Sequence, residues 1–403
     1  MRLVESHLVT ESSMRYKSLD NLCFLSKNLY NSSLYHIKNH YSTAGVYLNY
    51  YDLDRKFKTS NQENYRALPI QVSQQTMRIL DKNHISYFKL IKKFKKKTDS
   101  LSGMPKPPMF KHSKTGRFIT ILTKNTFKIR DGIITFSPKL KLNPLKTKIT
   151  ETINQIRIIP LNKSYKIEIV YEVSEIPLKF NDNKASIDLG VNNLATITTN
   201  TDIDNYILNG KPIKSDNHYY NKILAKIKSD LEIKNKSKKS KKLNRLYLKH
   251  NNKSDDYLHK SSKKILDILI EKDISELAIG YNTGWKSDIN LGSKTNQNFC
   301  AIAHKKFIDM IIYKCKLKGI KVMLNEESYT SKCSALDKET LGFKNNYLGK
   351  RAKRGMFISA DGTVINADVN GSLNIGRKVF GDDYVNNYLT NKGYGQYPIK
   401  INV

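Results

Sequence analysis

The chain has 403 residues, of which 39% are hydrophobic, and its 70 Lys and Arg against 36 Asp and Glu give a formal net charge of +34. Such a field concentrates phosphate polyanions, so the charge favours a nucleic-acid-binding protein over one whose basic residues serve only solubility. No run approaches the roughly 18 apolar residues of a membrane span, and the first residues do not resemble a signal peptide. We expect no membrane partner and an intracellular location, in the cytoplasm or nucleoid of a bacterium or the nucleus of a eukaryote.

The first 180 residues predict a β-barrel with a helical insertion. Alternating apolar residues predict a strand at residues 1–10, helical spacing follows over about 11–98, and short alternating strands recur from 117 to 180. The helical block ends in a basic run that includes Lys92 and Lys93, and then in a proline-rich segment at 103–108 that cannot be helical. This region is either a solvated linker or a nucleic-acid contact.

Residues 181–330 predict an α/β domain with a mixed sheet. A strand hairpin at 185–199 precedes the strand at 275–279, the helix at 305–317 and the strand at 319–324. Between the strand hairpin and the strand at 275–279, residues 222–264 predict two helices that pack through one apolar stripe. Basic residues far outnumber acidic ones there, so we expect this hairpin to face nucleic acid through residues that include Lys238, Lys239, Lys241 and Lys242. Residues 364–380 predict a last helix of the same domain, and residues 381–403 a weakly ordered tail.

Two aspartates lie where such a sheet would place them together. Asp188 ends a strand within residues 186–192 (SIDLGVN), and Asp368 opens a helix within residues 365–375 (INADVNGSLNI). A carboxylate at the end of a buried strand is costly to desolvate unless cations or hydrogen bonds compensate it. Two of them, far apart in the chain, predict ligands for hard cations.

These motifs resemble the ribonuclease-H-like RuvC fold and, more closely, the TnpB and Fanzor proteins, RNA-guided DNA nucleases related to type V CRISPR effectors. The resemblance covers nearly the whole chain. It includes the segments 68–69 (LP), 74–75 (QQ), 105–108 (PKPP), 257–261 (YLHKS), 327–332 (ESYTSK) and 366–371 (NADVNG).

The resemblance implies an endonuclease associated with a mobile element. Three acidic groups would hold two Mg²⁺ ions, with Mn²⁺ as a substitute, and Asp188 and Asp368 match the first and third of them. A monomeric ribonucleoprotein would pair its guide RNA with target DNA beside a short flanking motif. The barrel with its insertion would then be the wedge-like and recognition part.

The second acidic motif departs from the family pattern. Gly280 stands where relatives carry a glutamate, and Glu276 lies too early on that strand. Glu326 and Glu327 follow a strand that neighbours the Gly280 strand in this fold. Because alternating side chains point to opposite faces, only one of the two should reach the metals. We favour Glu327 by its spacing from Tyr329 and keep Glu326 as the alternative, while both being ordinary strand-end acids remains a third reading.

The zinc ribbon expected between the second and third motifs is also degenerate. Residues 331–363 retain only Cys333, and one thiolate cannot complete a tetrahedral zinc site. The other cysteines, Cys23, Cys300 and Cys315, form no close pair with it or with each other. We therefore predict no zinc and no disulfide framework.

Instead, the segment 331–363 predicts a metal-free hairpin that presents Lys350, Arg351 and Arg354 to nucleic acid. Its expected apolar contacts are Leu336, Phe343, Tyr347, Leu348, Met356 and Phe357.

Two other functions stay open. Gly280 fits a nuclease-inactive relative that occupies guided DNA sites and represses transcription. A transposase acting on transposon ends without RNA is the other, although so basic a surface speaks for an RNA partner.

Overall fold

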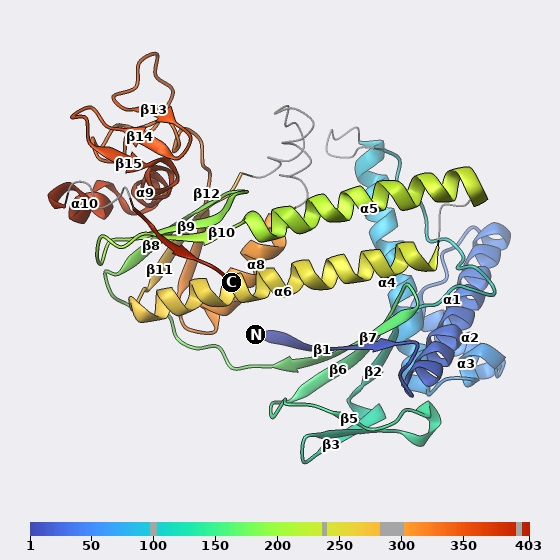
Figure 1. Ribbon diagram of the computed structural model, residues 1–403. Coiled ribbons are helices and arrows are strands. Elements are labelled where there is room, and N and C mark those ends of the chain that lie inside the picture. Colours follow the sequence, from blue (N-terminus) through green and yellow to red (C-terminus); the bar gives the residue numbers. More distant parts are fainter. Residues whose placement is uncertain (97–102, 236–239, 283–301, 392–396) are drawn as a thin grey trace. The chain divides into compact units, whose positions relative to one another are not determined.

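The computed structural model describes residues 1–96, 103–235, 240–282, 302–391 and 397–403 (Figure 1). They form two compact units, Met1–Ser174 and Glu175–Val403, and each unit is described by itself. None of the helices in these ranges is long and apolar enough to cross a membrane.

The strands of the first unit form two antiparallel sheets, one of four strands in the order β1-β7-β6-β2 and one of three in the order β3-β4-β5. The first strand pairs over its whole length with the last, from Arg2 opposite Glu172 to Thr10 opposite Ser164. Closure into a barrel stays a prediction. The strands are β1 (Arg2–Thr10), β2 (Thr120–Thr123), β3 (Phe127–Arg130), β4 (Ile133–Phe136), β5 (Leu145–Lys146), β6 (Ile153–Leu161) and β7 (Ser164–Glu172), with short 3₁₀ turns η1 (Lys124–Thr126) and η2 (Pro138–Leu140).

Four helices come between β1 and β2 in the chain: α1 (Tyr16–Ala44), α2 (Tyr50–Thr59), α3 (Glu63–Arg66) and α4 (Ile70–Lys95). Asn49 caps α2 by accepting hydrogen bonds from two backbone N–H groups of its first turn. The apolar faces of these helices share one core with the sheet, in which Leu22, Leu80, Leu122 and Ile156 are all buried.

The second unit is built on a six-stranded mixed sheet with the order β12-β11-β8-β9-β10-β16. A meander of β8, β9 and β10 is antiparallel, whereas β11 and β12 run parallel to β8 on its other side. The carboxyl ends of β8, β11 and β12 therefore lie along one edge. The strands are β8 (Lys184–Leu189), β9 (Asn193–Thr199), β10 (Tyr206–Asn209), β11 (Glu276–Gly280), β12 (Lys321–Asn325) and β16 (Ile399–Ile401).

Helices cover this sheet. The apolar side of α8 (His304–Lys316) packs into the sheet's core through Phe307 and Ile311. The helix α9 (Ala367–Phe380) is held to β8 by buried hydroxyl groups, because Ser186 donates to the carbonyl of Ser372 and Ser372 donates to the carbonyl of Ser186. Just beyond the helix, Tyr384 donates to the carbonyl of Thr198 in β9.

The predicted basic hairpin is formed by α5 (Lys211–Asn235) and α6 (Lys241–Glu271). Ser240 caps α6 by accepting a hydrogen bond from Leu243 N–H. The two helices meet through the apolar stripe expected from the sequence: Ile223, Leu224, Ile227, Leu231, Leu243, Leu246 and Tyr247.

Two expectations about the C-terminal region need correction. Within the segment that follows β12, Phe357 is buried, but Phe343 and Leu348 are 74% and 56% exposed and do not hold it together. The tail is also more ordered than predicted, because β16 adds to the main sheet beside β10. The remaining elements are β13 (Lys350–Lys353), β14 (Met356–Ile358), β15 (Val364–Asn366), η3 (Asp382–Val385) and α10 (Asn386–Thr390).

Candidate active site

Acidic side chains of β8, of the segment after β12 and of α9 lie at the carboxyl edge of the main sheet. Asp188 lies near the end of β8 in register with Thr196 of β9, and Gly280 ends the neighbouring strand β11. Glu327 follows the end of β12, the strand beyond. Because β8, β11 and β12 are parallel, the chain reaches the same edge three times.

Asp188 lies directly against α9. A Cβ atom on Gly371 would be 2.7 Å from Asp188 Oδ2, so only glycine lets the helix come this close to the carboxylate. Asp368 lies in the first turn of the same helix, where Asn366 accepts a hydrogen bond from its N–H. Asn193, which begins β9, donates to Asp368 Oδ2 at 2.6 Å and orients that carboxylate.

Glu327 fills the space that a side chain at position 280 would need. A Cβ atom on Gly280 would be 2.5 Å from Glu327 Oε1 and 2.6 Å from Ile375 Cδ1 of α9. The Glu327 N–H donates to Asn282 Oδ1 at 2.8 Å, which fixes the backbone beyond the strand. Glu327 Oε1 is buried and has no hydrogen-bond partner in the described part of the chain.

The electrostatics of these groups are coupled. Burial raises the pKa of Asp188 well above its ordinary value, and the charges of Glu327 and Asp368 raise it further, while Arg351 partly offsets them. Burial also raises the pKa of Glu327 to about 7. Arg351, an exposed residue of β13, brings Nη2 to 4.0 Å from Asp368 Oδ1. The fold therefore keeps carboxylates close together at a cost that a cation would remove.

The donor set fits Mg²⁺, which prefers carboxylate oxygens. Glu327 Oε1 has no hydrogen-bond partner among the described residues, and the absence of side chains at Gly280 and Gly371 lets the carboxylates of Glu327 and Asp188 lie against those positions. Within the described ranges, no three Asp, Glu, His or Cys side chains already converge on one point. Like charges repel one another, and Asp368 is drawn toward Asn193 and Arg351 instead.

The other acidic residues weighed from the sequence lie elsewhere. Glu326 is exposed and accepts a hydrogen bond from Ser328. Glu276 lies at the opposite end of β11, where it forms an ion pair with Lys321 at 2.7 Å.

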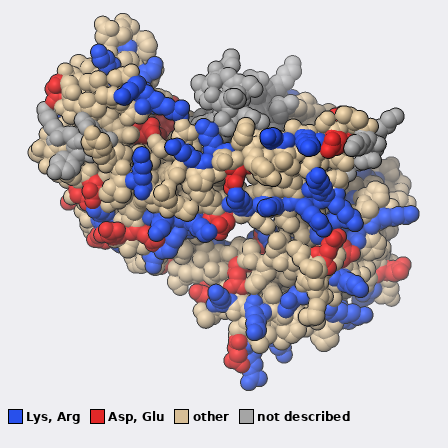
Figure 2. Space-filling view, in the orientation of Figure 1, with Lys and Arg blue, Asp and Glu red and all other residues tan. Residues whose placement is uncertain are grey.

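The predicted nucleic-acid contacts divide into two groups. Arg351 lies at the carboxylates, and the rest of those described are exposed on helix or hairpin surfaces: Lys92, Lys93, Lys241, Lys242, Lys350 and Arg354. Lys238 and Lys239 lie outside the described residues. Basic side chains prevail over the part of the drawn face where α5 and α6 lie (Figure 2).

Sequence reasoning missed Asn193, Asn282 and Gly371. Each follows or faces an expected motif, yet an asparagine near a strand end usually indicates only a turn. Their roles depend on contacts between segments far apart in the chain, such as Asn193 with Asp368.

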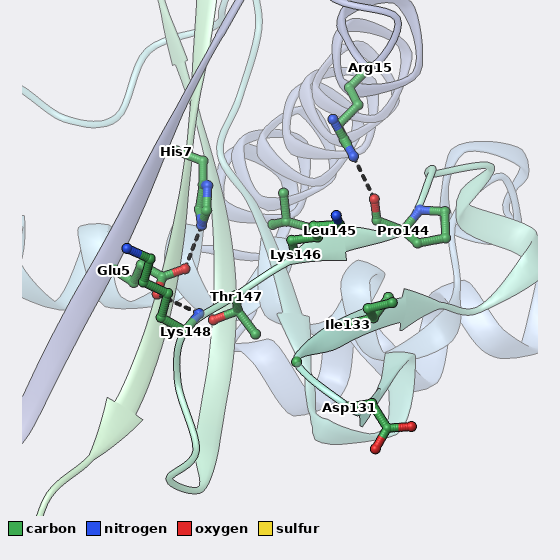
Figure 3. Close-up of a pocket in the computed structure, with 11 residues that line it drawn as sticks. Glu5, His7, Arg15, Asp131, Ile133, Pro144, Leu145, Lys146, Thr147 and Lys148 are labelled. Carbon is green, nitrogen blue, oxygen red and sulfur yellow. Dashed lines mark hydrogen bonds and ion pairs between the residues drawn. The ribbon is translucent and has the colours of Figure 1, made fainter.

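The first unit contains a separate hollow of about 1090 Å³ between β1 and the sheet β3-β4-β5 (Figure 3). Its polar wall is largely self-paired, because Glu5 accepts hydrogen bonds from His7 and from the backbone N–H of Lys148, and Arg15 donates to the carbonyl of Pro144. Burial raises the pKa of Glu5, but these hydrogen bonds outweigh it and hold the pKa below its usual value. Nothing in this wall marks a reaction centre.

Comparison with known proteins matches two segments of the chain to protein families. Residues 168–286 match the family described as "Probable transposase", and residues 304–375 match "Cas12f1-like, TNB domain". No curated protein matches the chain. These two matches confirm the resemblance to TnpB-type proteins that was inferred from the sequence.

Solved structures of low identity align over most of the chain. A Cas12f1–sgRNA–target DNA complex is 15% identical with a TM-score of 0.38, covering 93% of this chain and 98% of that one. A CRISPR–Cas12f ternary complex is 13% identical with a TM-score of 0.34, covering 89% and 80%. The mini-RNA-guided endonuclease CRISPR-Cas phi3 is 11% identical with a TM-score of 0.48, covering 94% and 92%.

Proposed function

We propose that the protein is an RNA-guided, Mg²⁺-dependent DNA endonuclease of the TnpB/Fanzor type, with a RuvC-like nuclease domain in its second unit. The observation that carries the proposal is the position of Glu327. Its carboxylate occupies the space above Gly280, where the family's second acidic residue would otherwise project, and it raises the pKa of Asp188 by its charge.

The sheet supports a ribonuclease-H-like reading of this domain. An antiparallel meander followed by two strands parallel to its first member gives the order β10-β9-β8-β11-β12, with acidic residues at the end of β8 and beyond β12. The match of residues 168–286 and 304–375 to the two families supports the same assignment.

Asp188, Glu327 and Asp368 would hold two Mg²⁺ ions. When bound, such ions activate water, orient the scissile phosphate and stabilise the leaving oxygen. Asn193 keeps one Asp368 oxygen fixed, so that its other oxygen points toward Arg351. Arg351, which lies 4.0 Å from Asp368 and whose charge lowers the pKa of Asp188, would meet the DNA phosphate. Hydrolysis of this kind leaves a 5′ phosphate and a 3′ hydroxyl.

A guide RNA and a target DNA with a short flanking motif are the proposed partners. Two of the aligned structures are a Cas12f1–sgRNA–target DNA complex and a mini-RNA-guided endonuclease. Base pairing would read the target sequence, and the protein, with its net charge of +34, would grip the heteroduplex by its backbone.

A guided repressor without nuclease activity is the second candidate. Gly280 and the splayed carboxylates favour it, because a dead site needs no third ligand. The burial of Glu327 argues against the repressor. An inactive site would have no use for a carboxylate that is buried without a hydrogen-bond partner. The third candidate is an RNA-independent transposase, because the family that residues 168–286 match is described as "Probable transposase".

The test is cleavage of a plasmid that matches the RNA co-purified with the protein. The proposal predicts Mg²⁺-dependent cutting by wild type that both RNase treatment and Asp188→Ala abolish. Specific DNA binding without cutting in Mg²⁺ or Mn²⁺ would favour the repressor. Specific binding that survives RNase would favour the transposase.

A further inference from the structure

One face of α1 fastens residues 103–118, a segment that we call the strap. Side chains spaced three or four residues apart on a helix share a face, and four side chains of α1 bind the strap. Asp20 holds Arg117 in a two-point ion pair with both distances at 2.8 Å. Lys27 donates to the carbonyl of Ser113.

The fastening continues toward the start of the strap. Asn31 and Lys111 exchange two hydrogen bonds, from Asn31 Nδ2 to the Lys111 carbonyl at 2.8 Å and from Lys111 N–H to Asn31 Oδ1 at 2.9 Å. Tyr30 donates to the carbonyl of Met109 at 3.2 Å. The backbone of the strap is thus fixed by polar contacts, which a solvated linker does not need.

The outward side of the strap is apolar at its centre. Met104, Met109 and Phe110 are 68%, 63% and 50% exposed. Lys38 of α1 places Nζ 4.8 Å from the centre of the Phe110 ring, so a cation already lies on one side of that ring. Fixing exposed apolar side chains on an anchored backbone lowers the entropy lost when a ligand covers them.

The charges around this apolar centre have one sign. The strap contains no Asp or Glu, and its exposed lysines are Lys106, Lys111 and Lys114. None of these three lysines forms an ion pair with a described residue. Since Arg117 is neutralised by Asp20, these lysines are the strap's cations that can pair with a polyanion; Lys111 also places Nζ 5.6 Å from the centre of the Tyr30 ring.

We propose that the strap binds unpaired nucleotides of a nucleic acid, with Met109 and Phe110 against the bases and Lys111 and Lys114 against the phosphates. This rests on the proposed function only in taking nucleic acid as the ligand, and it requires no cleavage. A polyanion with flat apolar faces complements such a surface, whereas a duplex hides its base faces in the stack.

The test measures binding of full-length protein to labelled single strands of about 16 nucleotides, oligodeoxythymidine and oligouridine, and to a duplex of the same length. The variant Met109→Ala/Phe110→Ala should weaken single-strand binding roughly tenfold and leave duplex binding within about twofold. Met14→Ala, an exposed apolar residue of the same unit outside the strap, should change neither. Unchanged thermal unfolding would establish that the variants fold.

Lysine variants provide a second readout. Lys111→Ala/Lys114→Ala should reduce the slope of log affinity against log salt by about one to two for the single strands. Equal losses on single strands and duplex, or no loss from Met109→Ala/Phe110→Ala, would overturn the proposal. If the wild-type protein bound single strands through the strap but did not cleave plasmid, the nuclease proposal would be refuted and the strap proposal would stand. If it cleaved plasmid but did not bind single strands through the strap, the strap proposal would be refuted and the nuclease proposal would stand.

Discussion

Two glutamates of the second unit are removed from water in opposite ways. Glu339, in the segment that follows β12, is 2% exposed, and both its oxygens accept backbone N–H groups, from Ser334 at 2.7 Å and from Leu348 at 3.0 Å. Lys344 Nζ lies 3.5 Å from it. Glu327 has one buried oxygen with no partner in the described residues and lies beside Asp188.

The difference in hydrogen bonding distinguishes Glu339, a structural carboxylate, from Glu327, a carboxylate that could bind a cation. Buried polar groups that serve the fold are satisfied, as Glu339 is, and it ties together a segment that retains a single cysteine. A buried carboxylate among like charges destabilises the metal-free protein, and a bound cation would relieve that cost. Variants of both glutamates and of their neighbours test this contrast.

The largest effect should come from Asp188→Ala or Asp368→Ala. Loss of a metal ligand removes several kcal/mol of transition-state stabilisation, so plasmid cleavage should fall by ~10³-fold or more. Circular dichroism should report an intact fold. Residual cutting close to that of wild type would exclude these residues from the site.

Gly280→Ala should reduce cleavage by roughly 10- to 100-fold, as for loss of a group that orients a ligand. The added methyl group would lie 2.5 Å from Glu327 Oε1 and displace it. The matched control is Gly342→Ala, because a Cβ atom there meets nothing within 4 Å. Equal activity of the two variants would mean that the space above Gly280 is not needed.

Glu339→Gln should destabilise the protein by about 3 kcal/mol, since an amide cannot replace two charge-assisted hydrogen bonds. The measurement is urea unfolding, with Glu326→Gln as the exposed control that should change stability by less than about 0.5 kcal/mol. A neutral Glu339→Gln would show that its segment is held mainly by apolar contacts.

Glu327→Gln should instead stabilise the metal-free protein, by on the order of 2 kcal/mol above pH 7. Its pKa rises from 4.5 to about 7 on folding, so the folded state favours the protonated form. The cost of ionisation is absent below about pH 4.5, grows between 4.5 and 7, and is complete above 7. Thermal unfolding in EDTA at pH 5 and pH 8 measures it, and a variant that lowers stability at both would contradict the burial of an unpaired charge.

Much of this architecture could be predicted from the sequence. Alternation and helical spacing predicted β1, the stripe between α5 and α6, and the strands that bear Asp188 and Gly280. These signals are local. Alternation predicted that only one of Glu326 and Glu327 would reach the site, and the spacing from Tyr329 led us to favour Glu327. The structure places Glu327 against Gly280 while Glu326 remains exposed.

The rest depended on contacts that no local pattern reveals. The order of the tail comes from pairing of β16 with β10, which is distant in the chain. Phe343 was predicted to be an apolar contact of the segment after β12, but it is exposed. That segment is instead stabilised by the hydrogen bonds of Glu339 and by the buried Phe357. Arg351 was predicted to face nucleic acid, and only the fold brings it within 4.0 Å of Asp368.

The most direct test of the central claim compares guide-matched plasmid cleavage by Glu327→Ala, Glu326→Ala and the relocation variant Gly280→Glu/Glu327→Ala, each as a co-purified ribonucleoprotein in Mg²⁺. The account predicts that Glu327→Ala loses cleavage, that Glu326→Ala cuts like wild type, and that relocation restores part of the activity. Cleavage by Glu327→Ala at the rate of wild type would contradict it, because the third carboxylate would then come from elsewhere.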